Sequence, residues 1–169
     1  ARLLAPKDSI PALKRPKASL LELVGTVKIP AAPKFVAQEK FVLNYGKEAK
    51  PGMRIAFLVD NFKQWFLGKV EEPMLDTVLQ YTMLTRPARD DEIRKEIGAE
   101  FEQTTLAQIF ALMGLQPNGK EGALLINWSA NMFYVPDINR VLRAVGVRWY
   151  VHDGGWGVNA CSVGNPGRW

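Results

Sequence analysis

The stretch VRWYVHDGGWGVNACSV, residues 147–163, decides most about the fold of this chain. On both sides of Gly154-Gly155, large apolar residues alternate with polar or small ones. Such alternation is typical of half-buried β-strands, and a pair of glycines suits the tight turn between them. We therefore predict a C-terminal β-hairpin that closes the sheet. The side chains expected to face the core are Trp149, Val151, Val158 and Ala160.

The same stretch holds the only histidine and the only cysteine, His152 and Cys161, so a Cys–His catalytic pair has to be tested against hairpin geometry. With a two-residue turn, Cys161 pairs with Arg148 and lies about 13 Å from His152 along the sheet, at ~3.3 Å per residue. A nucleophile and its base need about 3 Å. A three-residue turn moves Cys161 to the opposite face. We therefore interpret Cys161 as structural and His152 as a surface residue, and predict no catalytic site.

The preceding stretch, PDINRVLRAVGVRWYV, fits two structures. Alternation of apolar residues from Val141 to Val151 predicts a strand, with PDIN as the turn before it. Helical spacing of Ile138, Val141 and Val145 fits a short helix over residues 138–145. We favour the strand, and the helix stays open as an alternative.

Two helices are expected near the middle of the chain. RDDEIRKEIG, residues 89–98, has acidic residues first and basic residues later, as the helix dipole favours. TTLAQIFALMGLQP, residues 104–117, has apolar residues at helical spacing behind a Thr105/Gln108 capping box. Short apolar segments around residues 35–46, 51–62, 76–87 and 123–135 predict strands. The predicted fold is α+β: a mostly antiparallel sheet of short strands, two central helices, the C-terminal β-hairpin and an extended basic N-terminal arm.

Residues 1–34 differ in composition from the rest. They contain seven basic and two acidic residues, an excess that equals the +5 net charge of the whole chain, and five of its eleven prolines. Proline disfavours long helices and central strands. We therefore predict an extended basic arm over residues 1–34, which includes the short apolar segment KASLLELVG. Residues 35–169 are predicted to form a compact domain. The arm residues expected to contact a partner are Lys7, Lys14, Arg15, Lys17, Leu20, Leu21 and Val24.

These features favour a non-catalytic binding or assembly protein whose arm docks on a larger partner, either a protein complex, a nucleic acid or further copies of the chain. Aromatic residues beside basic ones also fit stacking on nucleic-acid bases. The candidates for stacking are Trp65, Arg148, Trp149 and Tyr150. Two alternatives stay open: a self-assembling structural protein, and a hydrolase that uses carboxylates. The candidate carboxylates are Asp60, Glu71, Glu72, Asp76, Asp90, Asp91 and Glu92.

Several classes of protein find no support in the sequence. It contains no apolar run long enough for a membrane span, no apolar core of a secretory signal, no phosphate-binding G-x-x-x-x-G-K-[ST] loop and no G-x-S-x-G motif. One cysteine excludes an internal disulfide. We expect a cytoplasmic protein with no cofactor, no metal and no membrane partner.

Three segments carry a resemblance to known proteins: NFKQWFLGKVEEP, TTLAQIFALMGLQPNGKEGALL, and MFYVPDINRVLRAVGVRW with the following GGWGVNACSVGNPGRW. Across residues 50–169 the chain resembles a family of short, uncharacterised proteins from candidate-phylum bacteria, for which no activity is known. Members of that family have a D-x-N-G turn where this chain has Asp137-Ile138-Asn139-Arg140. The resemblance therefore supports a turn before the strand.

Overall fold

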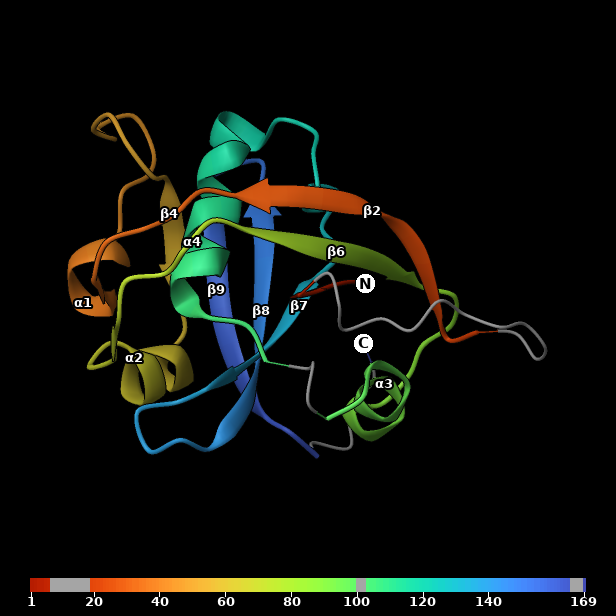
Figure 1. The fold of residues 1–169 in the computed structure, drawn as a ribbon. Helices are drawn as coiled ribbons and strands as arrows, with labels where there is room; N and C mark the ends of the chain where they lie inside the picture. Colours follow the sequence, from red (N-terminus) through yellow and green to blue (C-terminus); the bar gives the residue numbers. More distant parts are fainter. Residues whose placement is uncertain (7–18, 100–102, 165–168) are drawn as a thin grey trace.

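The computed structural model describes residues 1–6, 19–99, 103–164 and 169. Its largest element is a seven-stranded sheet with the strand order β2-β6-β1-β7-β8-β9-β4 (Figure 1). Its strands are β1 (Arg2–Pro6), β2 (Leu21–Ile29), β4 (Ile55–Leu58), β6 (Thr77–Leu84), β7 (Asn131–Pro136), β8 (Leu142–Tyr150) and β9 (Gly155–Ser162). A second, two-stranded sheet pairs β3 (Phe35–Val36) with β5 (Val70–Glu71).

The large sheet is mixed, so the prediction of a mostly antiparallel sheet is wrong. β1 pairs with β7 and β4 pairs with β9 in parallel, whereas the other neighbouring strands are antiparallel. Tight turns force neighbours such as β8 and β9 to run antiparallel. β1 and β4 instead reach their parallel neighbours from distant parts of the chain, where no local turn sets the direction. The α+β class is confirmed.

Both predicted central helices are present, as α3 (Asp90–Ile97) and α4 (Leu106–Leu115). At the start of α4, Thr105 and Gln108 form the predicted capping box, with Gln108 N donating to Thr105 Oγ1 at 3.1 Å. The other helices among the described residues are α1 (Ala37–Lys40), α2 (Asp60–Phe66) and the 3-10 helix η2 (Pro117–Gly119).

The two central helices cover opposite faces of the sheet. On β8, Val145 belongs to the core that contains the apolar side chains of α4, and its neighbour Ala144 belongs to the core that contains those of α3. Successive residues of a strand point to opposite faces. Figure 1 shows α4 lying across β8 and β9, with α3 well away from it.

Residues 1–34 do not form a separate arm in their described parts. β1 lies inside the sheet between β6 and β7, and β2 pairs with β6 along its length. The division into an arm and a domain of residues 35–169 is therefore wrong for these residues. β1 ends at Pro6 and β2 ends just before Pro30, so proline bounds these strands instead of interrupting them.

The C-terminal hairpin is confirmed, but its register differs from the predicted one. β8 and β9 are joined through residues 151–154, Tyr150 pairs with Gly155, and Cys161 pairs with Ala144 instead of Arg148. His152 lies in the turn, far along the hairpin from Cys161. Because the turn is longer than predicted, Val151 is 58% exposed and does not face the core.

The stretch before this hairpin forms a strand, as predicted, and not a helix. β7 and β8 pair from Pro136↔Leu142 onward, with a turn over residues 137–141. Asp137 fixes the turn: one carboxylate oxygen accepts from Asn139 N at 2.8 Å and Val141 N at 3.0 Å. Arg140 in this turn has a φ of 63°, in the left-handed region that favours glycine.

Candidate functional site

A chain of aromatic rings lies on the face of the sheet opposite α4, beside the part that α3 covers. We call Tyr45, Phe57, Tyr150, Trp128 and His152 the aromatic strip. Its successive ring centroids are 6.4 Å (Tyr45–Phe57), 4.9 Å (Phe57–Tyr150), 5.5 Å (Tyr150–Trp128) and 6.2 Å (Trp128–His152) apart. Tyr45, Phe57 and Trp128 are 45%, 43% and 50% exposed. So much exposed aromatic surface in one place is unusual on a monomer and typical of a binding surface.

Glycines in the hairpin set the position of the central ring. Gly157 of β9 pairs with Arg148 on β8 and with Phe57 on β4. A Cβ atom at Gly157 would lie 2.3 Å from the ring of Tyr150, so only glycine lets this ring lie against the backbone of β9. The ring of Tyr150 is therefore held in place between Phe57 and Trp128.

Trp128 is held in a conformation that its side chain does not favour. Its φ is 68°, in the left-handed region where a bulky residue is a genuine outlier. Such strain costs about 1–3 kcal/mol and persists mainly at functional sites. Half-exposed, Trp128 gains little from core packing, so the strain points to a function for the exposed ring.

Polar groups lie next to the strip. Arg148 is exposed on the same face as Tyr150, two residues away on β8. Asn159 lies over Gly146, and its Oδ1 atom is buried without a hydrogen-bond partner among the described residues. Together with Phe57, these side chains line a small hollow of about 30 Å³ in the sheet face. The strip thus combines ring faces with one cation and a free acceptor.

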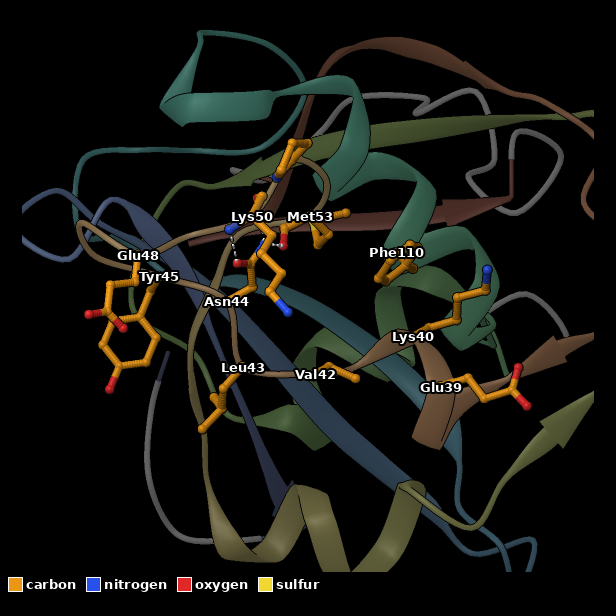
Figure 2. A pocket seen from close by; sticks show the side chains of 11 residues that line it. Glu39, Lys40, Val42, Leu43, Asn44, Tyr45, Glu48, Lys50, Met53 and Phe110 are labelled. Carbon is orange, nitrogen blue, oxygen red and sulfur yellow. Dashed lines mark hydrogen bonds between the residues drawn. The ribbon is translucent and has the colours of Figure 1, made fainter.

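A groove of about 520 Å³ adjoins the strip at Tyr45 (Figure 2). Its walls are the loop after α1 and the side chain of Phe110 on α4. Asn44 fixes the loop by donating to Lys50 O at 3.0 Å and Met53 O at 2.9 Å. Figure 2 shows Lys40 and Glu39 on one side of the groove and Tyr45 on the other.

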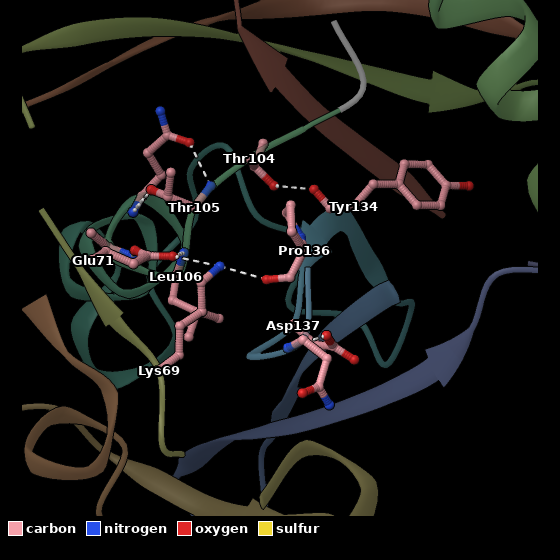
Figure 3. A network of polar contacts seen from close by, with 11 residues as sticks. Lys69, Glu71, Thr104, Thr105, Leu106, Tyr134, Pro136 and Asp137 are labelled. Carbon is pink, nitrogen blue, oxygen red and sulfur yellow. Dashed lines mark hydrogen bonds and ion pairs between the residues drawn. The ribbon is translucent and has the colours of Figure 1, made fainter. Parts of the chain in front are cut away.

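The buried or half-buried candidate carboxylates, Glu71 and Asp90, are engaged in structural contacts. Glu71 accepts from Leu106 N and Ala107 N, both at 2.9 Å, and so caps α4, while Lys69 lies 3.1 Å from it (Figure 3). Asp90 accepts from the hydroxyl of Tyr134 at 2.7 Å. The remaining candidates are spread over different elements. Asp60 begins α2 and forms an ion pair with Lys63. Glu72 and Asp76 are exposed in the segment after β5, whereas Asp91 and Glu92 lie on α3.

No cluster of three or more histidine, cysteine, aspartate or glutamate residues suited to a metal ion occurs within residues 1–6, 19–99, 103–164 and 169. No described helix has the length and apolarity needed to cross a membrane.

The predicted arm contacts need correction where the structure describes them. Leu20 and Leu21 are 4% and 1% exposed because they pack beneath α3, where Glu96 accepts from their backbone N–H groups at 3.1 and 3.0 Å. They are therefore not available to a partner. Val24 is 48% exposed on β2. The four basic residues Lys7, Lys14, Arg15 and Lys17 lie outside the described residues.

The predicted stacking residues separate into three places. Trp149 is 6% exposed in the core under α4, so it is wrong as a stacking residue. Trp65 lies away from the strip, with the guanidinium of Arg143 4.0 Å over its ring. Arg148 and Tyr150 do lie on the open face. Tyr45, Phe57 and Trp128 were missed, because no spacing in the sequence shows that three distant segments meet at one sheet edge.

Comparison of the chain with models of protein families, with curated proteins and with solved structures returns no match. The resemblance of residues 50–169 to short proteins of candidate-phylum bacteria stays a prediction. The function has to be inferred from the surface itself.

Proposed function

We propose that this protein is a non-catalytic binding protein, and that the aromatic strip holds a single strand of nucleic acid. The observation that carries the proposal is Trp128, a half-exposed ring kept in a strained backbone conformation between Tyr150 and His152 in the aromatic strip. Bases stack on exposed aromatic side chains with about 1–3 kcal/mol per base, and this stacking tolerates any sequence.

Charge supports an anionic partner. Arg148 lies beside Tyr150 on the open face, and the chain carries a net charge of +5, all of it accounted for by residues 1–34. Arginine binds phosphate groups and also stacks on bases. Lys7, Lys14, Arg15 and Lys17 would add phosphate contacts, which give affinity without sequence preference and weaken as salt rises.

The test is fluorescence anisotropy with a labelled single-stranded oligothymidylate of about twelve nucleotides, within the usual site size. We expect saturable binding whose affinity falls steeply between about 50 and 200 mM salt. Trp128→Ala should weaken binding about tenfold, as expected for the loss of one stacked base. Leu75→Ala serves as the matched control, because Leu75 is 84% exposed and lies outside the strip. Equal affinity of the two variants, or no binding by the unaltered protein, would contradict the proposal.

A second candidate function is assembly through β2. This nine-residue strand stands at the edge of the sheet, with Leu23 51% and Val24 48% exposed, and pairs only with β6 among the described residues. A long open edge can accept a strand from another chain. Light scattering at two protein concentrations tests this: self-association should appear in the unaltered protein and disappear in Leu23→Lys, which blocks an edge with charge.

A further inference from the structure

A second hollow lies on the other face of the sheet, beneath α4. It is enclosed by the last turn of α4 with η2, by residues 52–54, and by Trp149 and Trp156 of the C-terminal hairpin. Its volume is about 410 Å³, within the range of sites that hold small organic molecules. It adjoins the groove of Figure 2 through Met53 and Phe110, whose side chains line both.

The walls suit a flat apolar molecule. Trp149 and Trp156 meet edge to face with ring centroids 5.2 Å apart, and they are 6% and 1% exposed. Phe110, Met53 and Met113 complete the apolar part of the lining. Aromatic walls favour a ring system, and methionine side chains adjust easily to the shape of a ligand.

Two glycines shape the wall of the hollow that the end of α4 forms. α4 continues to Leu115, so Gly114 lies inside the helix, where glycine costs about 1 kcal/mol relative to alanine. A Cβ atom at Gly114 would lie 3.6 Å from Met53 Cε, so a longer side chain there would fill the hollow. Gly119 has a φ of 70° and passes so close to Trp149 that a Cβ atom would lie 2.4 Å from Nε1. The helix end thus closes around Trp149 while Gly114 leaves the space beside it open.

One charged residue is part of the lining of this apolar space. Among the described residues, Arg54 is the only charged one that lines the hollow, and it forms no ion pair with any of the others. A cation without a counter-ion beside an apolar cavity favours a ligand with a negative charge at one end. Asn118 adds an amide to the lining.

We propose that this hollow binds a small aromatic carboxylate, with the ring system against Trp149 and Trp156 and the carboxylate at Arg54. The proposal is independent of the nucleic-acid site, because the two surfaces lie on opposite faces of the sheet.

The experiment is isothermal titration calorimetry with 2-naphthoate and with its neutral counterpart 2-naphthalenemethanol, supported by tryptophan fluorescence. We expect naphthoate to bind at least tenfold more tightly than the alcohol and to change the fluorescence. Arg54→Gln should remove this preference and leave the binding of the alcohol unchanged. Arg148→Gln, on the opposite face, is the matched control and should bind naphthoate as the unaltered protein does.

Gly114→Leu tests the location, because its side chain would occupy the hollow and abolish binding. Gly114→Ala controls for folding: it should raise the melting temperature, since alanine suits the helix better, and should keep measurable binding. If Gly114→Leu unfolds, Met113→Phe provides a second obstruction from the same helix. Absence of naphthoate binding, equal affinity for acid and alcohol, or full binding by the folded obstructed variants would each overturn the proposal.

Discussion

Trp149 and Tyr150 are neighbours in the chain, yet they serve opposite faces of the sheet. Trp149 is buried under α4 against Trp156, whereas Tyr150 meets Phe57 and Trp128 in the aromatic strip. β8 therefore takes part in both proposed sites, with Trp149 lining the hollow beneath α4 and Tyr150 lying among the exposed rings. This arrangement makes the two surfaces separately accessible to mutation.

Gly157→Ala should displace the ring of Tyr150. A Cβ atom at residue 157 would lie 2.3 Å from the ring of Tyr150. In the sheet, Gly157 pairs with Phe57 on one side and with Arg148 on the other. We expect a loss of about 1–3 kcal/mol in the free energy of unfolding, as is usual for overpacking, together with weaker oligonucleotide binding. Denaturant unfolding and anisotropy measure the two effects. Gly68→Ala is the control, because the nearest atom to its Cβ would be 3.9 Å away; equal losses in both variants would refute the role of Gly157.

Trp128→Gly and Trp128→Ala should separate strain from binding. Both remove the ring and should weaken oligonucleotide binding alike. At a φ of 68°, however, the backbone of glycine is unstrained, whereas the backbone of alanine is strained. Trp128→Gly should therefore be more stable than Trp128→Ala by about 1 kcal/mol. Thermal unfolding of the two variants measures the difference. If the alanine variant proves equally stable, the residue carries no backbone strain.

The sequence predicts those parts of the fold that local patterns determine. The capping box at Thr105 marks α4, and alternation around the glycine pair marks the C-terminal hairpin, because neighbouring residues fix helices and tight turns. The position of β1 in the middle of the sheet depends on contacts with β6 and β7 across long chain separations, which no local pattern encodes. The composition of residues 1–34 predicts an extended basic arm, but apolar residues such as Leu3 and Leu4 lie in the core.

The candidate site was only partly predictable for the same reason. The period of two along β8 places Trp149 and Tyr150 on opposite faces. Both were nevertheless candidates for stacking, and only Tyr150 lies on the open face. Tyr45, Phe57 and Trp128 come from segments that meet only in the folded sheet. The strained φ of Trp128 and the contact of Tyr150 with Gly157 exist only in three dimensions.

Glu71→Ala should destabilise the protein through α4 and Lys69 together. The carboxylate of Glu71 accepts from two backbone N–H groups at the start of α4. Its loss also removes the ion-pair partner of Lys69, which keeps its hydrogen bond to the carbonyl of Pro136 (Figure 3). We expect a loss of about 3 kcal/mol, typical of breaking a buried ion pair. In the double variant Glu71→Ala, Lys69→Met the stranded charge is absent, so the loss should be smaller. A double variant less stable than the single one would contradict this explanation.

Asp137 should make the stability of the protein depend on pH in acid. Burial opposes the ionisation of Asp137, but hydrogen bonds from Val141, Arg143 and Asn139 outweigh it and keep its pKa below the ordinary value. Its stabilisation is therefore complete above the unfolded-state pKa near 3.9 and is lost as the pH falls through the lower folded-state pKa. Asp137→Asn should cost about 2 kcal/mol at pH near 6 and much less at pH near 2. Urea unfolding at both values measures this, and a pH-independent difference would refute the assignment.

Cys161 should react slowly as a nucleophile, and without help from His152. Burial, and secondarily the negative charge of Asp90, raises the pKa of the Cys161 thiol, so less of the reactive thiolate is present at neutral pH than in an unfolded chain. The hairpin register places His152 in the turn and Cys161 opposite Ala144, near the other end of β9. Alkylation by iodoacetamide, followed by mass spectrometry, should therefore be at least tenfold slower in the native protein than in urea. His152→Gln should leave the native rate unchanged at every pH, whereas a rate that falls with this substitution would restore the Cys–His pair that the register excludes.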